Sequence, residues 1–284
     1  MTSVADNAVK IVKQASLFRL IVIPLTVVAA WLIETFLLEK NLRTFAIFNG
    51  ENLLLYTIFA CILTGIVIPV LLIVRSFRTG DVNMFQIGFR TPKRTLAACA
   101  VAFFAGYCAI LLAGPPASGR LALVSAFLVF LPTGIASAVV CWVLAGTHIQ
   151  AAVRRGGIIV SIPAGVIITG ILFGLSSAVH SFSPDPQTLV SRFIGAGIIA
   201  AFFFFAIRDV YATAVIVTFS DMILAGGGID PAYFAGLSAW IIVPAVLALG
   251  TLLCIHWYLF THFTTIQVPV PLQKIPGTEG AGKD

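Results

Sequence analysis

Apolar residues occur along the chain in long runs, which short connectors bearing polar, Pro or Gly residues separate. A transmembrane helix needs about 20 consecutive, mostly apolar residues, and eight runs are close to that length. They cover residues 18–38, 53–74, 95–114, 121–146, 158–180, 189–207, 210–227 and 236–261. No connector is long enough for a separate soluble domain. The pattern therefore predicts an all-α fold, a polytopic membrane helix bundle of about eight transmembrane helices.

The two ends of the chain differ from this membrane domain, which we assign to residues 17–262. Residues 1–16 mix apolar side chains with Lys10 and Lys13, a pattern typical of a short interfacial helix. Residues 263–284 are predicted to form a cytoplasmic tail. The first apolar run is longer than the h-region of a signal peptide, so we expect no cleaved signal.

The overall composition agrees with a membrane protein. Hydrophobic residues make up 60% of the 284 residues and charged residues 10%, against about 45–50% and about 25% in ordinary soluble domains. A soluble protein of this size could not cover so much apolar surface with so few charges. Disorder is excluded as well, because disordered chains are polar and highly charged. The main partner is therefore expected to be the lipid bilayer.

The positions of the basic residues predict the orientation of the bundle. The chain has 17 Lys and Arg against 11 Asp and Glu, and cytoplasmic loops carry an excess of Lys and Arg. With eight spans and the N-terminus inside, four basic residues lie outside, namely Lys40, Arg43, Arg120 and Arg192. The thirteen on the inner side are Lys10, Lys13, Arg19, Arg75, Arg78, Arg90, Lys93, Arg94, Arg154, Arg155, Arg208, Lys274 and Lys283. We expect a multi-pass protein of the cell membrane with both termini in the cytoplasm. We interpret the surplus positive charge as a signal of membrane topology. We expect no nucleic acid as a partner.

Asp221 is the ionisable residue that falls nearest the middle of a predicted span. A charged side chain there costs about 2.5–3.5 kcal/mol, so each such residue suggests a function. Two interpretations stay open: a carboxylate that accepts a proton or binds a substrate, and a structural Asp that is protonated or paired with a hydroxyl group. Nearby hydroxyl and imidazole groups complete a candidate polar intramembrane site with Asp221. They are Thr218, Ser220, Ser177 and His180.

Other polar residues are expected at the membrane boundaries. Arg208 and Asp209 are interpreted as a boundary pair on the inner face, and His148 as a residue of the inner loop after the fourth span. Small residues predict where two helices pack closely, because they let backbones approach in lipid. Gly170 and Gly174 form a GxxxG motif, and Gly195 and Gly197 lie in the next span.

Neither a cofactor nor a metal ion is predicted. The five cysteines fall inside predicted spans, where the usual role is that of a small buried apolar group. They are Cys61, Cys99, Cys108, Cys141 and Cys254. The sequence has no CxxC pair and no HExxH motif, so the common zinc sites are not supported. His180 and His256 fall at different depths, whereas a pair of haem ligands needs matching depths.

Three short segments together resemble a known family. Phe85–Arg94 looks like a basic approach to a membrane span, Gly146–Ala151 like a Gly-x-x-x-Gln/Arg-Ala run, and Leu172–Leu175 like an LFGLxH element. In this order they resemble the CPBP family of CAAX proteases and bacteriocin-processing enzymes, over about residues 80–225. The resemblance implies an eight-helix fold with an intramembrane site built from three motifs, EExxxR, FxxxH and HxxxN.

The resemblance places these motifs on residues that lack the expected chemistry. The motif-equivalent positions are Val140, Cys141, Ala145, Phe173, Ser177, Val217 and Asp221. Of the family's residues only Phe173 is retained, while both glutamates, the arginine and both histidines are missing. Because Val and Ala cannot accept a proton, the family's peptide hydrolysis cannot proceed in its usual form. The resemblance therefore implies a pseudoenzyme.

The resemblance also requires the matched positions to lie at one depth. Val140 falls near the inner end of a fourth span that stops at residue 146, whereas Ser177 falls near the outer end of the fifth. Either the fourth helix continues through Val153, or the alignment does not hold.

Three functions follow from these observations. The favoured hypothesis is a catalytically inactive relative of the CPBP proteases that binds a lipid or hydrophobic peptide, or serves as a scaffold or accessory subunit of a membrane protein complex. The second is a small transporter or channel that uses Asp221. The third is an active intramembrane endopeptidase with a rearranged site, in which His180 and Asp221 act as a pair.

Overall fold

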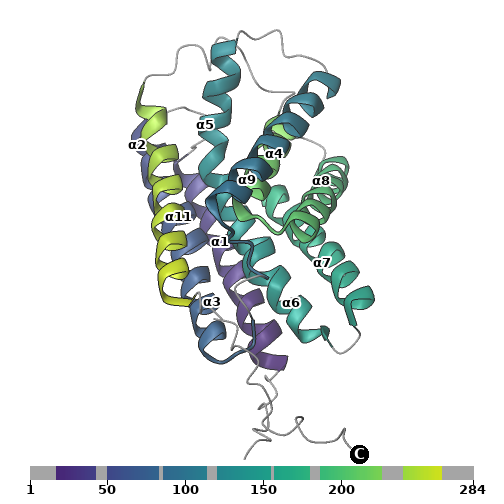
Figure 1. The fold of residues 1–284 in the computed structure, drawn as a ribbon. Coiled ribbons are helices and arrows are strands. Elements are labelled where there is room, and N and C mark those ends of the chain that lie inside the picture. Colours follow the sequence, from purple (N-terminus) through teal and green to yellow (C-terminus); the bar gives the residue numbers. More distant parts are fainter. Residues whose placement is uncertain are drawn as a thin grey trace, which may run out of the picture.

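The computed structural model describes residues 17–42, 50–82, 86–113, 120–154, 157–179, 186–225 and 239–263. The predicted interfacial segment 1–16 and nearly all of the predicted tail lie outside the described residues. Within the described ranges the chain is helical and forms no strand, which confirms the all-α fold (Figure 1).

Three long helices each contain a stretch of wider π-helical turns. They are η1 (Phe18–Val22) with α1 (Ile23–Leu42); α2 (Gly50–Tyr56), η2 (Thr57–Val67) and α3 (Ile68–Arg78); and α5 (Arg120–Ser137), η3 (Ala138–Gly146) and α6 (Thr147–Ala152). The other helices are α4 (Pro92–Ala113), α7 (Gly157–Val179), α8 (Pro186–Ile207), α9 (Val210–Ala225) and α11 (Ile242–Phe263), the last preceded by the short turn η6 (Ala239–Ile241).

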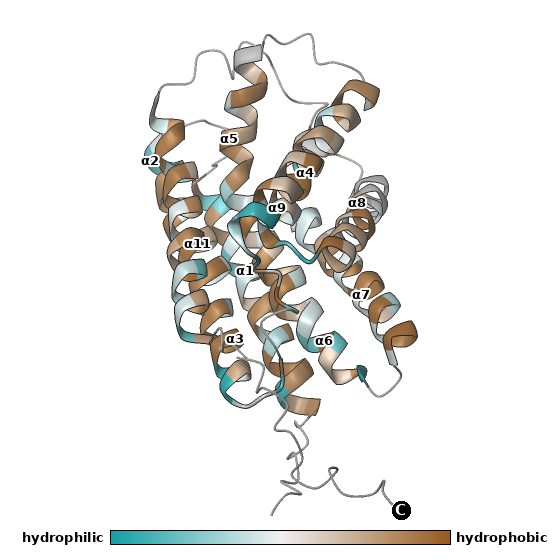
Figure 2. Ribbon diagram, viewed as in Figure 1, coloured by the Kyte–Doolittle hydropathy of each residue, from teal (hydrophilic) through white to brown (hydrophobic). Residues whose placement is uncertain are grey.

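Six of the described helices are long and apolar enough to cross a membrane. They are Phe18–Leu42, Gly50–Arg78, Pro92–Leu112, Ala122–Ala152, Gly157–Ser177 and Ile242–Phe263. Two shorter apolar helices, Phe193–Ile207 and Val210–Ile223, coincide with the sixth and seventh predicted spans. Hydrophobic residues make up much of the helical ribbon in Figure 2. The chain is thus a multi-pass membrane helix bundle.

The fourth span is longer than predicted. The helix continues without a break from Arg120 to Ala152, past the expected end at residue 146. This outcome agrees with the first of the two alternatives, since Val140 then lies twelve residues, or roughly 18 Å, from the helix end. The helix continues because residues 147–152 include no Pro or Gly, the usual helix breakers.

The middle of this long helix is the centre of the bundle. Every residue of η3, from Ala138 to Gly146, is buried, and α1, α3, α7 and α9 pack around it. The outer helices instead expose large apolar side chains such as Leu112 and Ile159, as expected for surfaces that face lipid. Residues of η3 therefore have only protein as their surroundings.

Glycines permit the close contact of α7 and α8 that the sequence predicts. A Cβ atom on Gly170 or Gly174 would lie 3.0 Å from the backbone nitrogen of Ile198 or Ile194, respectively. Gly195, by contrast, has no atom within 4 Å of its Cβ position. The GxxxG motif is confirmed as a packing site, whereas Gly195 takes no part in it.

Because of this difference, replacing Gly174 or Gly195 with Ala should affect the free energy of unfolding in different directions. Gly174→Ala should lower the free energy of unfolding by about 1–3 kcal/mol, because the new methyl group overpacks the α7–α8 contact. Gly195→Ala should leave stability unchanged or raise it by up to about 1 kcal/mol through helix propensity. Unfolding of the purified protein in detergent measures both. Equal effects of the two changes would contradict the packing described.

Candidate functional site

The helices that carry the motif-equivalent positions lie next to one another. Both α7 and α9 pack against η3, and the ring centroids of Trp142 and Phe173 are 5.2 Å apart. Six of the seven positions are buried, while Asp221 is half-buried. The buried ones are Val140, Cys141, Ala145, Phe173, Ser177 and Val217. The centre at which these helices meet is therefore apolar and packed.

The hydroxyl groups of the candidate intramembrane site bond to their own helices. Ser177 donates to the carbonyl oxygen of Phe173 at 2.9 Å, Thr218 to that of Ala214 at 2.8 Å and Ser220 to that of Ile216 at 2.9 Å. Asp221 lies close enough to Cys141 for an electrostatic interaction. His180 lies outside the described residues, and the described part contains no group of three His, Cys, Asp or Glu that could hold a metal ion.

Polar side chains gather instead at one end of the bundle, which we call the basic end. It is the end at which α1 begins and α3 and α6 finish, and it carries Arg19, Arg75, Arg78 and Arg154 (Figure 1). One hydrogen-bonded network lies there, and a second surrounds the turn between α8 and α9. Both include a residue of α6.

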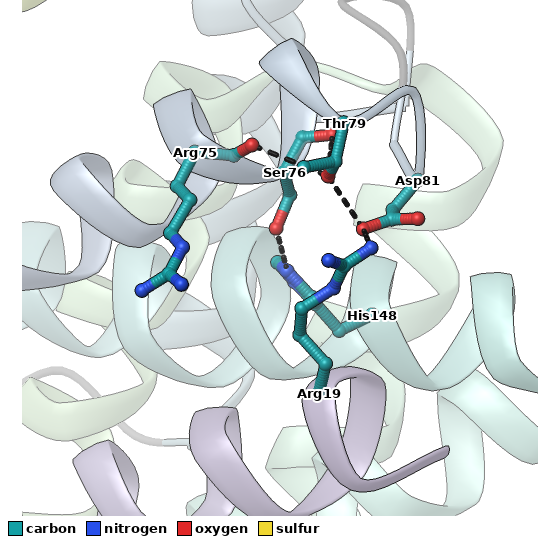
Figure 3. A network of polar contacts seen from close by, with 6 residues as sticks. All are labelled: Arg19, Arg75, Ser76, Thr79, Asp81 and His148. Carbon is teal, nitrogen blue, oxygen red and sulfur yellow. Dashed lines mark hydrogen bonds and ion pairs between the residues drawn. The ribbon is translucent and has the colours of Figure 1, made fainter. Parts of the chain in front are cut away.

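The first network joins α3 to α6 through Ser76 and His148 (Figure 3). The Nδ1 atom of His148 lies 2.8 Å from the carbonyl oxygen of Leu144. Because a carbonyl can only accept, Nδ1 carries the hydrogen, and Nε2 of the neutral ring has a free lone pair. The Ser76 hydroxyl then donates to Nε2 at 2.7 Å.

The same network also includes the beginning of α1. Arg19 forms an ion pair of 2.5 Å with Asp81, just after the end of α3. The hydroxyl of Thr79 donates to the same Asp81 oxygen at 2.6 Å, and the backbone N–H of Asp81 donates to the carbonyl of Ser76. Polar contacts therefore hold η1, the end of α3 and the beginning of α6 in one arrangement (Figure 3).

Ser76 and His148 also have the separation expected of a nucleophile and its general base. Their side chains are buried, however, with 7% of Ser76 and 1% of His148 exposed. A nucleophile has to reach its substrate, and neither group presents an open face to one. We interpret the pair as a structural bond that holds α3 against α6.

The second network surrounds the turn between α8 and α9. Arg208, which has a positive φ of 56°, donates to the backbone carbonyl of Gln86 at 3.2 Å and to the side chain of Gln150 at 2.9 Å. Its guanidinium group lies 4.7 Å from the centre of the Phe205 ring. Arg208 thus joins the turn to α6 and to the segment before α4.

Asp209 caps the helix that follows. It is fully buried and accepts hydrogen bonds from the backbone N–H of Ala212 at 3.0 Å and the hydroxyl of Thr95 at 2.7 Å. The first bond is an N-cap, which satisfies a helical N–H that otherwise lacks a partner. The second ties α9 to α4.

The arginines of this network act electrostatically on one another. Burial and, to a lesser degree, the charge of Arg90 lower the pKa of the Arg208 guanidinium to about 10. Burial and then the charge of Arg94 lower the pKa of Arg90, which Asp209 raises in part. Both groups remain cations at neutral pH.

The sequence predicts the positions of some residues in these networks and misses others. His148 is expected in an inner loop but lies in helix α6. The Arg208–Asp209 pair lies between α8 and α9, and both of its residues form hydrogen bonds with other segments. Glu39, which accepts a hydrogen bond of 2.8 Å from Tyr56 inside the bundle, was not singled out. The helical spacing of the buried residues Trp31, Thr35 and Glu39 could have indicated it.

We compared the chain with known proteins. No protein-family model, no curated protein and no solved structure matches the chain.

The buried pair yields a prediction about stability. Ser76→Ala should lower the free energy of unfolding by about 1–3 kcal/mol, because the buried Nε2 atom of His148 loses its donor. Ser220→Ala serves as the control, since the hydroxyl of Ser220 bonds within its own helix; its effect should stay within about 0.5 kcal/mol. Denaturant unfolding in micelles compares the two, and a Ser76→Ala effect no larger than the control would show that the bond does not hold α3 against α6.

Proposed function

We propose that the chain is a non-catalytic, eight-span protein of the cell membrane, related to the CPBP proteases, with both termini in the cytoplasm. The six long apolar helices and the two shorter ones that coincide with the remaining predicted spans support the count of eight. The arginines of the basic end support the orientation, because cytoplasmic surfaces are rich in Lys and Arg.

The observation that carries the non-catalytic part is the packed centre where η3, α7 and α9 meet. Peptide hydrolysis needs groups that activate water and groups that stabilise an oxyanion. At the motif-equivalent positions the chain has Val140, Cys141 and Ala145 fully buried, and the Ser177 hydroxyl donates to its own helix. The loss of each acid or base group lowers the rate of hydrolysis by a factor of about 10²–10⁴.

The same packing favours a role on the outside of the bundle. Because η3 is enclosed by other helices, a lipid or a hydrophobic peptide has its contacts with the outward faces of the outer helices. These faces expose large apolar side chains. The chain then serves as a lipid-binding protein or as a scaffold or accessory subunit of a membrane protein complex.

A hydrolysis assay tests the non-catalytic part. The purified protein in proteoliposomes should cleave neither a prenylated CAAX peptide nor a bacteriocin-type leader peptide above the rate of the Asp221→Ala variant. Asp221→Ala is the matched control because it removes the carboxylate at the last motif-equivalent position. Cleavage by the wild type that disappears in this variant would contradict the proposal.

A further inference from the structure

Four cations gather where α4 begins, and we call them the α4 cation cluster. Its members are Arg90, Lys93, Arg94 and Arg208. Arg90 donates to the backbone carbonyl of Arg208 at 3.0 Å, and Arg94 lies 3.4 Å from that of Ile207. In Figure 2 the hydrophilic first turn of α4 and the hydrophilic α8–α9 turn lie near one another. Cations held this close repel one another unless an anion lies among them.

The start of α4 differs in its electrostatics from the start of α9. At α9 the protein supplies its own anion, because Asp209 caps the helix. The first turn of α4 has no acidic residue and carries Lys93 and Arg94 instead. The N-terminus of a helix has a partial positive charge and favours anions. Two cations in this turn are therefore unfavourable for α4 alone.

Asp209, the acidic residue beside the cluster, acts on Arg90 and raises its pKa in part. Asp209 accepts hydrogen bonds from Thr95 and Ala212 and is fully buried, so it does not face the outer side of the cluster. Lys93 and Arg94 are exposed. The outward face of the cluster thus presents positive charge at the point where α4 enters the bundle.

An exposed apolar stripe continues from these cations along α4. Leu96 and Phe104 are 73% and 72% exposed, and the stripe continues through Phe103, Tyr107 and Leu111. Spacings of three, four, seven and eight residues place these side chains on one face of the helix. A site with cations at one end and an apolar face beyond them matches an anionic headgroup followed by acyl chains.

We propose that the α4 cation cluster binds the phosphate group of an anionic glycerophospholipid of the cytoplasmic leaflet, whose acyl chains lie on the α4 stripe. This inference rests on the proposed membrane orientation. The lipid phosphate supplies the anion that the first turn of α4 lacks, and the bilayer supplies the apolar part. Basic residues at a membrane surface attract anionic lipids in this way.

Lipid titration of the purified full-length protein, followed by native mass spectrometry, tests the proposal. Phosphatidylglycerol should bind more tightly than phosphatidylcholine, and the double variant Lys93→Gln/Arg94→Gln should lose roughly fivefold in phosphatidylglycerol affinity for each cation removed. Arg75→Gln/Arg78→Gln is the matched control, because it removes two exposed charges from the last turn of α3 at the basic end. This control should change the affinity less than about twofold, since its charges lie outside the cluster.

Thermal unfolding separates lipid binding from a structural role. In micelles with phosphatidylcholine alone, Lys93→Gln/Arg94→Gln should melt no lower than the wild type, since it relieves α4 of two unfavourable cations. Added phosphatidylglycerol should then stabilise the wild type and not the variant. Equal losses of affinity in the two double variants, or no preference for phosphatidylglycerol, would overturn the proposal. Stabilisation by excess inorganic phosphate as large as that by phosphatidylglycerol would identify a soluble phosphate as the ligand and overturn the lipid assignment.

A separate labelling experiment distinguishes failure of this site from failure of the proposed orientation. A membrane-impermeant thiol reagent should label a Lys93→Cys variant in inside-out vesicles and leave it unlabelled in intact cells. Labelling in intact cells would show that the proposed orientation is wrong and that the α4 cation cluster does not face the cytoplasmic leaflet. The lipid preference in micelles does not depend on orientation, so its loss alone would count against the site.

Discussion

A helix enclosed by other helices can satisfy its polar side chains only within the bundle, and this constraint acts most strongly on α6. The π-helical middle contains no charged residue, while α6 has Thr147, His148 and Gln150, all buried. Thr147 donates to Val143 in its own helix, His148 bonds to Ser76 of α3, and Gln150 accepts from Arg208. A buried polar group without a partner costs about 1–3 kcal/mol. The positions of α3 and of the α8–α9 turn therefore depend on the polar groups of α6.

The exposed charge at the start of α4 follows from this arrangement. Arg208 donates hydrogen bonds to Gln86 and Gln150 and lies over the Phe205 ring. These contacts belong to Arg208 and not to the other cations near the start of α4. Asp209 accepts hydrogen bonds from the backbone of α9 and from the hydroxyl of Thr95. These buried groups of α6 and of the α8–α9 turn are thus satisfied within the bundle, whereas the Nε1 atom of Trp142 in η3 has no hydrogen-bond partner among the described residues. Lys93 and Arg94 lie exposed at the start of α4.

The sequence was sufficient for features that depend on periodicity and small residues. Long apolar runs located the helices, and the Gly170–Gly174 motif located the α7–α8 contact. Helix ends were less predictable, because α3 and α6 continue through Arg75, Arg78 and Gln150, polar residues that a hydropathy pattern assigns to loops. Partners distant in sequence, such as Ser76 with His148 or Tyr56 with Glu39, depend on how the helices are arranged, which the pattern of one chain does not contain. The candidate site at Asp221 was selected for its charge, whereas in the structure the hydroxyl groups of Ser177, Thr218 and Ser220 bond to their own helices.

The burial of every residue of η3 predicts that water does not reach the meeting point of η3, α7 and α9. The most direct test keeps Cys141, which is fully buried, and replaces the other four cysteines with Ala. The protein in membranes is then treated with a charged, membrane-impermeant thiol reagent, and an Arg154→Cys variant of this background, with Cys141 also replaced by Ala, provides an exposed reference site. We expect labelling of the reference and no labelling of Cys141 in the folded protein. Labelling of Cys141 before unfolding would reveal a water-filled cavity at the motif-equivalent positions and contradict the closed packing of this centre.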